Sequence, residues 1–308
     1  MKILRSPIIY YGGKGVLVYK LLNFIPEHKI YCEVFGGGAS LLFAKRPSET
    51  DIYNDIDKEL FNLFQVLKDK KKFEEFKRLV DLTLYARAEH QYCKRNYKKE
   101  KNKVKRAWMF YIMLRQSFSG LPNVGWSYCV NAARKNATVS VHRYWAGVNM
   151  LPQIHQRLLN VQIDCDDFRN VIPRYDTEKT FFYCDPPYLP QTRSSRSVYR
   201  HEMTFEEHEE LIELLLKVKG KVMLSGYKND LYKKLEDNGW IRVDIETSCF
   251  TAGRTRISGV LGEGSAKEKY KRVESIWMNY DLTIFSDDYK TLPAEMSKSE
   301  DGIRLELF

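Results

Sequence analysis

A short apolar run that ends in an acid and two prolines stands at Phe181-Phe182-Tyr183-Cys184-Asp185-Pro186-Pro187-Tyr188. The aromatic and apolar residues predict a buried strand. Proline lacks a backbone N–H and has a fixed φ, so we expect the strand to end at Asp185, before a stiff turn through Tyr188. In open α/β sheets, ligands bind at this C-terminal edge of the strands. The stretch therefore predicts an α/β fold with a ligand site at Asp185.

The predicted turn combines hydrogen-bond acceptors with a flat aromatic face. The acceptors are the carboxylate of Asp185 and the carbonyls fixed by Pro186 and Pro187, and Tyr188 supplies the ring. Such a set suits a planar group with an exocyclic amino group, such as adenine or cytosine. The tetrapeptide alone fits a proline-terminated strand with a buried tyrosine equally well, so the rest of the chain must decide.

A second predicted strand, 30–35, is followed at once by Gly36-Gly37-Gly38-Ala39-Ser40 and an apolar helix start. Strand, glycine turn and helix form the nucleotide-binding arrangement, although Leu41 stands where the dinucleotide fingerprint needs a third glycine. Residues 51–57 then predict a strand that ends in acids. Of these, Asp55 can bind ribose hydroxyls and Asp57 can cap the helix that follows, and we expect each acid to do one job.

Further apolar runs predict strands at 161–163, 221–225, 241–245 and 273–280, with helices between them. Thr204 and Glu207 have the spacing of a capping box, which predicts that a helix begins there. The acids at 164–167 can bind a ligand or cap the next helix. A polar loop at 191–201 is expected near the site, and 253–271 suggests a hairpin or arm. Residues 281–308 look like a polar tail until their last residues.

Positive charge is concentrated in one segment. Residues 68–106 hold fifteen basic and six acidic side chains, an excess of nine in a chain whose net charge is +10. The pattern is helical, with interleaved aromatics. A charge run is usually a solvated face, but this local excess is nearly the whole net charge and favours a phosphate-binding surface. An apolar run at 107–114 then predicts a helix, and the polar segment from Arg115 up to Tyr144 can enter a DNA groove or simply connect elements.

The composition limits the class of protein. A chain of 308 residues with 44% apolar residues can form one large domain or a domain with an insert. Its six cysteines are scattered without a C-x-x-C pair, which argues against a zinc site and against a disulfide framework. The N-terminus is too short and polar for a signal peptide, and no apolar run is long enough to span a membrane. A cytoplasmic protein is therefore expected.

Four segments in this order resemble the Dam-type (D12 class, α group) DNA adenine-N6 methyltransferases, which use S-adenosylmethionine. They are Tyr10-Tyr11-Gly12-Gly13-Lys14, Glu33-Val34-Phe35-Gly36-Gly37-Gly38-Ala39-Ser40, Asn54-Asp55-Ile56-Asp57 and Asp185-Pro186-Pro187-Tyr188. The resemblance implies a Rossmann-like sheet with a small, mostly helical DNA-recognition insert. The implied domains are a catalytic domain (1–66 and 145–285), the insert (67–144) and a C-terminal tail (286–308).

The resemblance also implies roles for individual residues. The catalytic residues are Asp185, Pro186, Pro187 and Tyr188. The cofactor-binding residues are Tyr10, Lys14, Phe35, Gly36, Gly38, Asp55, Asp167 and Asp185. The DNA-binding residues are Arg115, Phe118, Ser119, Arg134, Lys135, Arg254 and Arg256. Two positions depart from the family pattern: Ala39 replaces a common glycine, and Ile9 stands where GATC-specific members have a lysine, so GATC specificity is not expected.

The predicted activity is methylation of adenine N6 in double-stranded DNA, with the base flipped out of the duplex. Cytosine-N4 methylation and a non-catalytic DNA-binding protein with a relict cofactor pocket stay open as alternatives. A monomer is the default for the family. The C-terminal Arg304-Leu305-Glu306-Leu307-Phe308 resembles peptides that dock on bacterial sliding clamps. The same residues can also form a frayed end or a strand that completes the fold.

Overall fold

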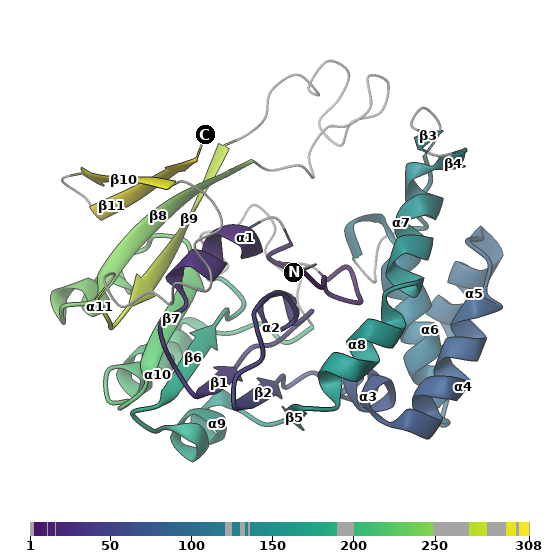
Figure 1. Cartoon of the computed structure of the whole chain (residues 1–308), viewed down its shortest axis with the longest axis horizontal. Helices are drawn as coiled ribbons and strands as arrows, with labels where there is room; N and C mark the ends of the chain where they lie inside the picture. The colour runs from purple at the N-terminus through teal and green to yellow at the C-terminus, as the bar shows by residue number, and fades with distance from the viewer. Residues whose placement is uncertain are drawn as a thin grey trace.

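A mixed β-sheet covered by helices forms the centre of the molecule in the computed structural model (Figure 1). The structure describes residues 3–10, 12–15, 17–120, 125–129, 133–134, 136–189, 200–248, 271–281, 294–299 and 302–307. Within these residues, nine strands form the main sheet in the order β10-β11-β8-β9-β7-β6-β1-β2-β5. The predicted α/β, Rossmann-like methyltransferase fold is thereby confirmed.

The strands that carry the site run parallel to one another, and β9 is antiparallel to both of its neighbours. The strands of the sheet are β1 (Ile30–Glu33), β2 (Thr50–Asn54), β5 (Val161–Asp164), β6 (Thr180–Cys184), β7 (Lys221–Gly226), β8 (Ile241–Ser248), β9 (Lys271–Met278), β10 (Ala294–Ser299) and β11 (Gly302–Leu307). After β1 the chain builds β2 and β5 on one side, and it later places β6 and β7 on the other. The topological switch point therefore lies between β1 and β6, where open sheets bind ligands.

Both faces of the central strands are buried. All five residues of β6 are buried, and successive residues alternate between two cores: Phe181 and Tyr183 pack into one, Phe182 and Cys184 into the other. Near-continuous apolar runs are typical of parallel strands covered by helices on both faces. This is why the short apolar segments of the sequence predicted these strands.

Helices cover the sheet and form a bundle beside it. They are α1 (Val18–Leu21), α2 (Ser40–Ala44), α3 (Lys58–Lys68), α4 (Lys70–Asp81), α5 (Arg87–Asn96), α6 (Lys103–Gln116), α7 (Val139–Val148), α8 (Leu151–Leu158), α9 (Phe168–Tyr175), α10 (Phe205–Leu215) and α11 (Lys233–Asp237), with 3-10 turns η1 (Leu22–Phe24) and η2 (Phe118–Gly120). The capping box of Thr204 and Glu207 is present at the start of α10. No described helix has the length and apolar composition to cross a bilayer.

The predicted basic helical segment consists of α4, α5 and α6 (Figure 1). Helices α4 and α5 each pack against α6, and α4 and α6 also pack onto α3. The sequence predicts one helix from Trp145 to Asn160, but the structure has two. The first, α7, begins earlier because the Thr138 side chain accepts a hydrogen bond from Val141 N, and Pro152 lies in the first turn of α8. The predicted insert boundary at 144/145 thus falls inside α7. A short strand pair, β3 (Ala133–Arg134) and β4 (Ala137–Thr138), precedes this helix.

The C-terminal segment differs from the expected polar tail. Strands β10 and β11 form an antiparallel hairpin, and β11 joins the sheet parallel to β8, with Ile303 opposite Val243 and Leu305 opposite Ile245. The sequence alternates apolar residues at 303, 305 and 307, which is the period of a strand. Residues 304–307 therefore complete the sheet here, while Phe308 and nearly all of the arm predicted at 253–271 lie outside the described residues.

Candidate active site

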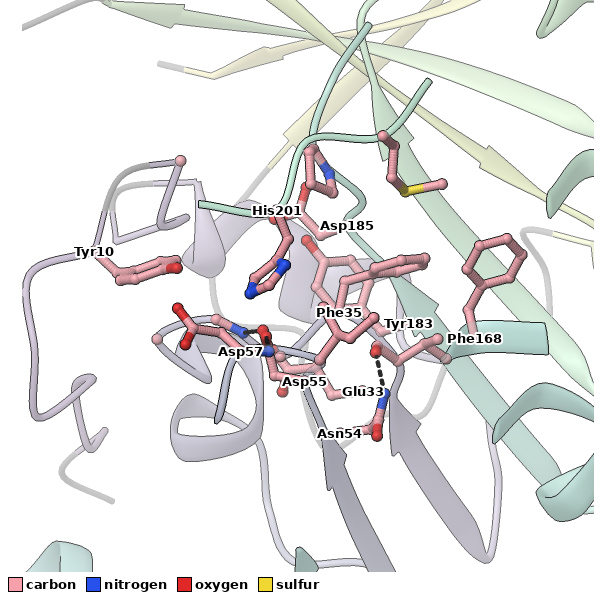
Figure 2. A pocket seen from close by; sticks show the side chains of 18 of the residues that line it. Tyr10, Glu33, Phe35, Asn54, Asp55, Asp57, Phe168, Tyr183, Asp185 and His201 are labelled. Atoms are coloured by element: carbon pink, nitrogen blue, oxygen red, sulfur yellow. Dashed lines mark hydrogen bonds between the residues drawn. The ribbon is translucent and has the colours of Figure 1, made fainter. Parts of the chain in front are cut away.

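One cavity opens at the C-terminal ends of β1, β2, β5 and β6, beside the switch point (Figure 2). All eight residues that the family resemblance assigned to the cofactor line this cavity. They come from the N-terminal segment, the glycine turn, and the loops after β2, β5 and β6. The parallel strands bring them together because their carboxyl ends share one edge of the sheet.

The glycine turn is held tightly against β2. Gly36 N donates to Asn54 O at 2.7 Å, and a Cβ on Gly36 would lie 2.2 Å from the Tyr53 ring, so only glycine fits. Ala39 has φ 55° and ψ 40°, the left-handed conformation that costs an alanine roughly 1–2 kcal/mol. This strain explains physically why a glycine suits the position that Ala39 occupies.

Of the acids after β2, Asp57 caps the next helix as expected, and the ribose-binding role of Asp55 stays a prediction. Asp55 accepts hydrogen bonds from Gly37 N at 2.7 Å and Asp57 N at 2.8 Å, while Asp57 caps α3 by accepting from Glu59 N at 2.8 Å. Burial raises the pKa of Asp55 to about 6, and the two backbone N–H groups oppose that shift. Each carboxylate oxygen of Asp55 keeps a second lone pair with which it can accept from a hydroxyl.

Two polar residues of the cavity were named in the motifs but were given no role. Asn54 joins three strand ends: its Nδ2 donates to Val34 O at 2.9 Å and Asp166 O at 3.0 Å, and its Oδ1 accepts from Asp166 N at 2.9 Å. Glu33, only 3% exposed, accepts from Tyr31 OH and from Leu42 N, both at 3.1 Å. Burial raises the pKa of Glu33 to about 8, so its carboxyl is largely neutral at pH 7.

The acid loop after β5 both caps a helix and lines the cavity. Asp167 accepts from Arg169 N at 2.9 Å as the N-cap of α9 and forms an ion pair with the Arg169 guanidinium at 2.9 Å. Both alternatives considered for these acids are thus compatible with the structure. Beside them the Phe35 and Phe168 rings, 5.7 Å apart, form an apolar wall. A flat aromatic group can lie against this wall with polar groups at its rim.

Asp185 lies in a network of buried charges. Lys14 Nζ lies 3.0 Å from Asp185 Oδ1 and 3.2 Å from Glu274 Oε2, and it donates a short hydrogen bond to Tyr188 OH. Burial raises the pKa of Asp185 to about 6, and the charge of Lys14 opposes that shift. Lys14 was assigned to the cofactor, but its charged atom contacts the predicted catalytic residues.

The turn after Asp185 is fixed from behind. Pro187 O accepts a hydrogen bond from His208 Nε2 at 3.0 Å, and the other ring nitrogen of His208 lies 2.8 Å from Tyr232 OH. Tyr188 was expected to offer a free stacking face. Its side chain is only 7% exposed, Lys14 Nζ lies 4.5 Å from its ring centre, and Tyr227 packs edge-on at 4.7 Å. A base can therefore reach this ring only after side chains move.

Arg200 closes one side of the cavity. It was not named as a site residue, although it belongs to the loop 191–201 that was expected near the site. Its guanidinium lies 3.0 Å from Asp57 Oδ1 and donates to Tyr97 OH at 3.3 Å. It also lies over the Phe110 ring at 5.5 Å. Arg200 thus connects the cavity with two residues of the helical segment, Tyr97 and Phe110. The isolated sequence carried no signal for this contact.

The predicted DNA-binding residues are only partly described. The Arg115 guanidinium donates to Arg143 O and Tyr144 O and packs on Gly147, so it holds α6 to α7. Phe118 is 44% exposed in η2. Ser119 and Arg134 are described in their backbone alone, in η2 and β3, and Lys135, Arg254 and Arg256 lie outside the described residues.

Several basic side chains of the helical segment are engaged within the fold. Lys68 donates to Val161 O, Lys72 pairs with Asp69, Lys77 pairs with Asp81, and Arg106 pairs with Glu59. Many others, including Lys98, Lys99 and Lys101, are exposed. In the part of the chain that the structure describes, no group of three His, Cys, Asp or Glu side chains is placed to hold a metal ion.

An α/β sheet with a cavity at its switch point, lined by apolar and polar side chains, is typical of enzymes that bind a nucleotide-like cofactor. The family of D12 class N6 adenine-specific DNA methyltransferases matches residues 10–248. Because this match covers most of the chain, the chain belongs to that family, and the resemblance found in the motifs is confirmed. The protein is thus an adenine-specific DNA methyltransferase.

Three relatives illustrate the similarity. The type II methyltransferase M.MjaIII of Methanocaldococcus jannaschii is 29% identical over 253 residues, covering 73% of this chain and 85% of the relative. The type II methyltransferase M1.LlaDCHI of Lactococcus lactis subsp. cremoris is 27% identical, covering 73% and 81%. The DNA adenine methylase of Escherichia coli strain K12 is 24% identical, covering 70% and 76%.

Proposed function

We propose that this chain transfers a methyl group from S-adenosylmethionine to N6 of an adenine that is flipped out of double-stranded DNA. The observation that carries the proposal is the position of Asp185. Its carboxylate ends β6 at the wall of a cavity that all eight proposed cofactor residues line. An acceptor for an amino group and a pocket for a methyl donor thus meet at one edge of the sheet.

Three features of the cavity support the proposed cofactor. Because Gly36 has no side chain and lies close to β2, only its backbone borders the cavity at this point. This leaves room for the methionine or ribose part of the cofactor. Asp55 can accept from ribose hydroxyls, and the wall of Phe35 and Phe168 suits an adenine ring. Bound S-adenosylmethionine supplies an electrophilic methyl group on its sulfonium.

The chain's own part of the reaction is to orient the target nitrogen. The Asp185 carboxylate accepts a hydrogen from the N6 amino group, with a prolyl carbonyl as the second acceptor, so that the nitrogen lone pair points toward the methyl group. The carboxylate also favours the positive charge that develops on N6. His208 keeps the turn in place through Pro187 O. Tyr188 stacks on the base once its ring is uncovered.

The test is a methyl-transfer assay with tritiated S-adenosylmethionine and adenine-containing duplex DNA, followed by nucleoside analysis. We expect N6-methyladenine as the product; labelled N4-methylcytosine would instead support the cytosine alternative. Asp185→Ala should lower turnover by at least about 100-fold while it keeps DNA affinity. A folded, cofactor-binding wild-type protein that transfers no methyl group would refute the proposal and favour a DNA-binding protein without catalysis.

Two finer expectations stay predictions: a monomer that meets DNA transiently, and a sliding-clamp contact through Arg304–Phe308. Clamp docking as a free peptide requires β11 to leave β8, because residues 303–305 pair there. A pull-down with a bacterial clamp tests the contact. Deletion of residues 304–308 should abolish capture, and unchanged capture would remove the idea.

A further inference from the structure

The Lys14 ammonium lies between two carboxylates and beside a tyrosine. Its Nζ is 3.0 Å from Asp185 Oδ1 and 3.2 Å from Glu274 Oε2, and its side chain is 6% exposed. Tyr188 OH, which accepts from Lys14, itself donates to Glu274 Oε2 at 3.1 Å. Among the described residues, Asp185 and Glu274 are the ion-pair partners of Lys14. The four side chains form one closed network.

Lys14 contacts the same two groups that bind the target base in the proposed function. Its nitrogen donates to the Asp185 carboxylate and lies 4.5 Å from the centre of the Tyr188 ring. The flipped adenine needs the same carboxylate for its amino group and the same ring for stacking. The Asp185 carboxylate has lone pairs for both donors, but the ammonium lies over the ring on which the base would stack. Lys14 must therefore shift away from this ring, and from Asp185 Oδ1, when the base enters.

A displaced ammonium cannot stay buried without a partner. The loss of a counter-ion in a buried site costs several kcal/mol. Glu274 is the remaining carboxylate of the network and already lies 3.2 Å from Lys14 Nζ, so only a small shift completes the exchange. It stands on β9, and β9 is hydrogen-bonded on both sides, to β7 and to β8. The second carboxylate is therefore held on a rigid element.

We propose that Glu274 is a positioning residue that takes over the Lys14 ammonium, and keeps Tyr188 OH in place, when the target amino group binds Asp185. The inference rests on the proposed role of Asp185 and adds a residue to it. Glu274 lies outside the lining of the cofactor cavity and acts through Lys14 and Tyr188. No step at Glu274 itself involves the reacting atoms.

The first test is Glu274→Gln, because glutamine can still accept from Tyr188 OH but carries no charge. We expect kcat to fall by about tenfold or more, while the KM for S-adenosylmethionine stays within about twofold. DNA that carries 2-aminopurine at the target position should still show the fluorescence rise of a flipped base, since this analogue lacks the N6 amino group. Glu274→Asp should recover part of the turnover.

The matched control is Glu246→Gln on the neighbouring strand β8, which removes an acid of similar burial outside the network. Its kcat and KM should stay at the wild-type values. The unfolding temperature and cofactor binding are measured for all variants. A variant that has lost only the positioning of Lys14 keeps both, whereas a variant that has lost its fold does not. A Glu274→Gln protein that is stable and has wild-type kcat would overturn the inference.

A double-mutant cycle with Lys14→Met provides the second test. If Glu274 acts by receiving Lys14, Glu274→Gln should have little further effect on kcat once the ammonium is gone. An equal loss in both backgrounds would show that Glu274 acts by another route and would refute the inference. Wild-type protein and Asp185→Ala are assayed alongside. If the proposed function is wrong, the wild-type protein will be inactive or Asp185→Ala will be fully active. Either result is independent of Glu274.

Discussion

The Asp185 carboxyl must be ionised to stabilise the positive charge that develops on the target N6. Burial raises its pKa to about 6, against an ordinary value of 3.8, while Lys14 opposes the shift and Glu274 adds to it. Protonation below pH 6 removes the negative charge of the carboxylate and turns one acceptor oxygen into a donor, so activity should fall there. We predict an acid limb in the profile of kcat/KM against pH with a midpoint near 6. A profile that is flat down to pH 5 would contradict this.

The same network predicts the direction in which a variant moves that limb. Lys14→Met removes the positive charge that lowers the pKa of Asp185. The pKa of the carboxyl should rise, and the acid limb should move to higher pH. Among the described residues, the charged and titratable groups that remain around Asp185 include Glu274, Tyr188, Tyr183, Glu33, Tyr232 and Cys184. A midpoint that stays in place or moves to lower pH would show that another group controls the limb.

At this scale the sequence predicted which residues meet, but not which atoms. The motifs brought eight residues to one cavity, because all of the motifs except the N-terminal one follow a strand of the same sheet. The contact between Lys14 and Asp185 was missed, because the motif resemblance assigned Lys14 to the cofactor alone. Glu274 was missed because it comes from an antiparallel strand far along the chain, and its partner contacts depend on tertiary packing.

The elements of the central sheet were predicted to within a few residues, since short apolar runs bounded by acids, glycines or prolines have few other interpretations. The break between α7 and α8 was missed, because both helices share one apolar pattern. Strand β10 was missed because Ala294–Ser299 is polar and pairs at the edge of the sheet, where no apolar face is required.

The segment that begins at Arg200 closes the cavity onto the helical bundle. The Arg200 side chain, which forms an ion pair with Asp57, is 30% exposed. Loss of this ion pair should therefore cost roughly 1 kcal/mol. We predict that Arg200→Ala raises the KM for S-adenosylmethionine by about fivefold with kcat unchanged. Lys234→Ala, which breaks the exposed pair with Glu213, is the control and should change neither constant. An unchanged KM in Arg200→Ala would exclude this role.

The 3-10 turn η2 presents Phe118, 44% exposed, at the end of α6. An exposed aromatic ring beside a basic bundle suits stacking on a base, which contributes about 1–3 kcal/mol. We predict that Phe118→Ala weakens DNA binding by that amount and leaves stability unchanged. Leu159→Ala removes an equally exposed side chain, 45%, between α8 and β5, and should leave DNA binding at the wild-type level. Equal effects of the two substitutions would argue against stacking at Phe118.

Across the whole molecule, the positive charge is distributed unevenly relative to the sheet. The helical bundle with its excess of basic residues lies on one side, and α11 lies on the opposite side of the molecule (Figure 1). A cavity alone does not recruit a polymer, whereas a basic surface attracts phosphates over a distance of about 10 Å at 0.1 M salt. DNA affinity should therefore depend on the bundle, and cofactor affinity on the strand ends.

This division predicts different salt dependences for two lysine pairs. Lys98 and Lys99 are exposed at the end of α5 in the bundle, whereas Lys233 and Lys234 belong to α11. Each lysine that neutralises a phosphate adds about 0.9 to the slope of log Kd against log salt. The Lys98→Ala/Lys99→Ala protein should lose about two from that slope and bind DNA more weakly. The Lys233→Ala/Lys234→Ala protein should keep the wild-type slope, and both should keep the KM for S-adenosylmethionine. Equal slopes in the two proteins would place the phosphate contacts elsewhere than in this part of the bundle.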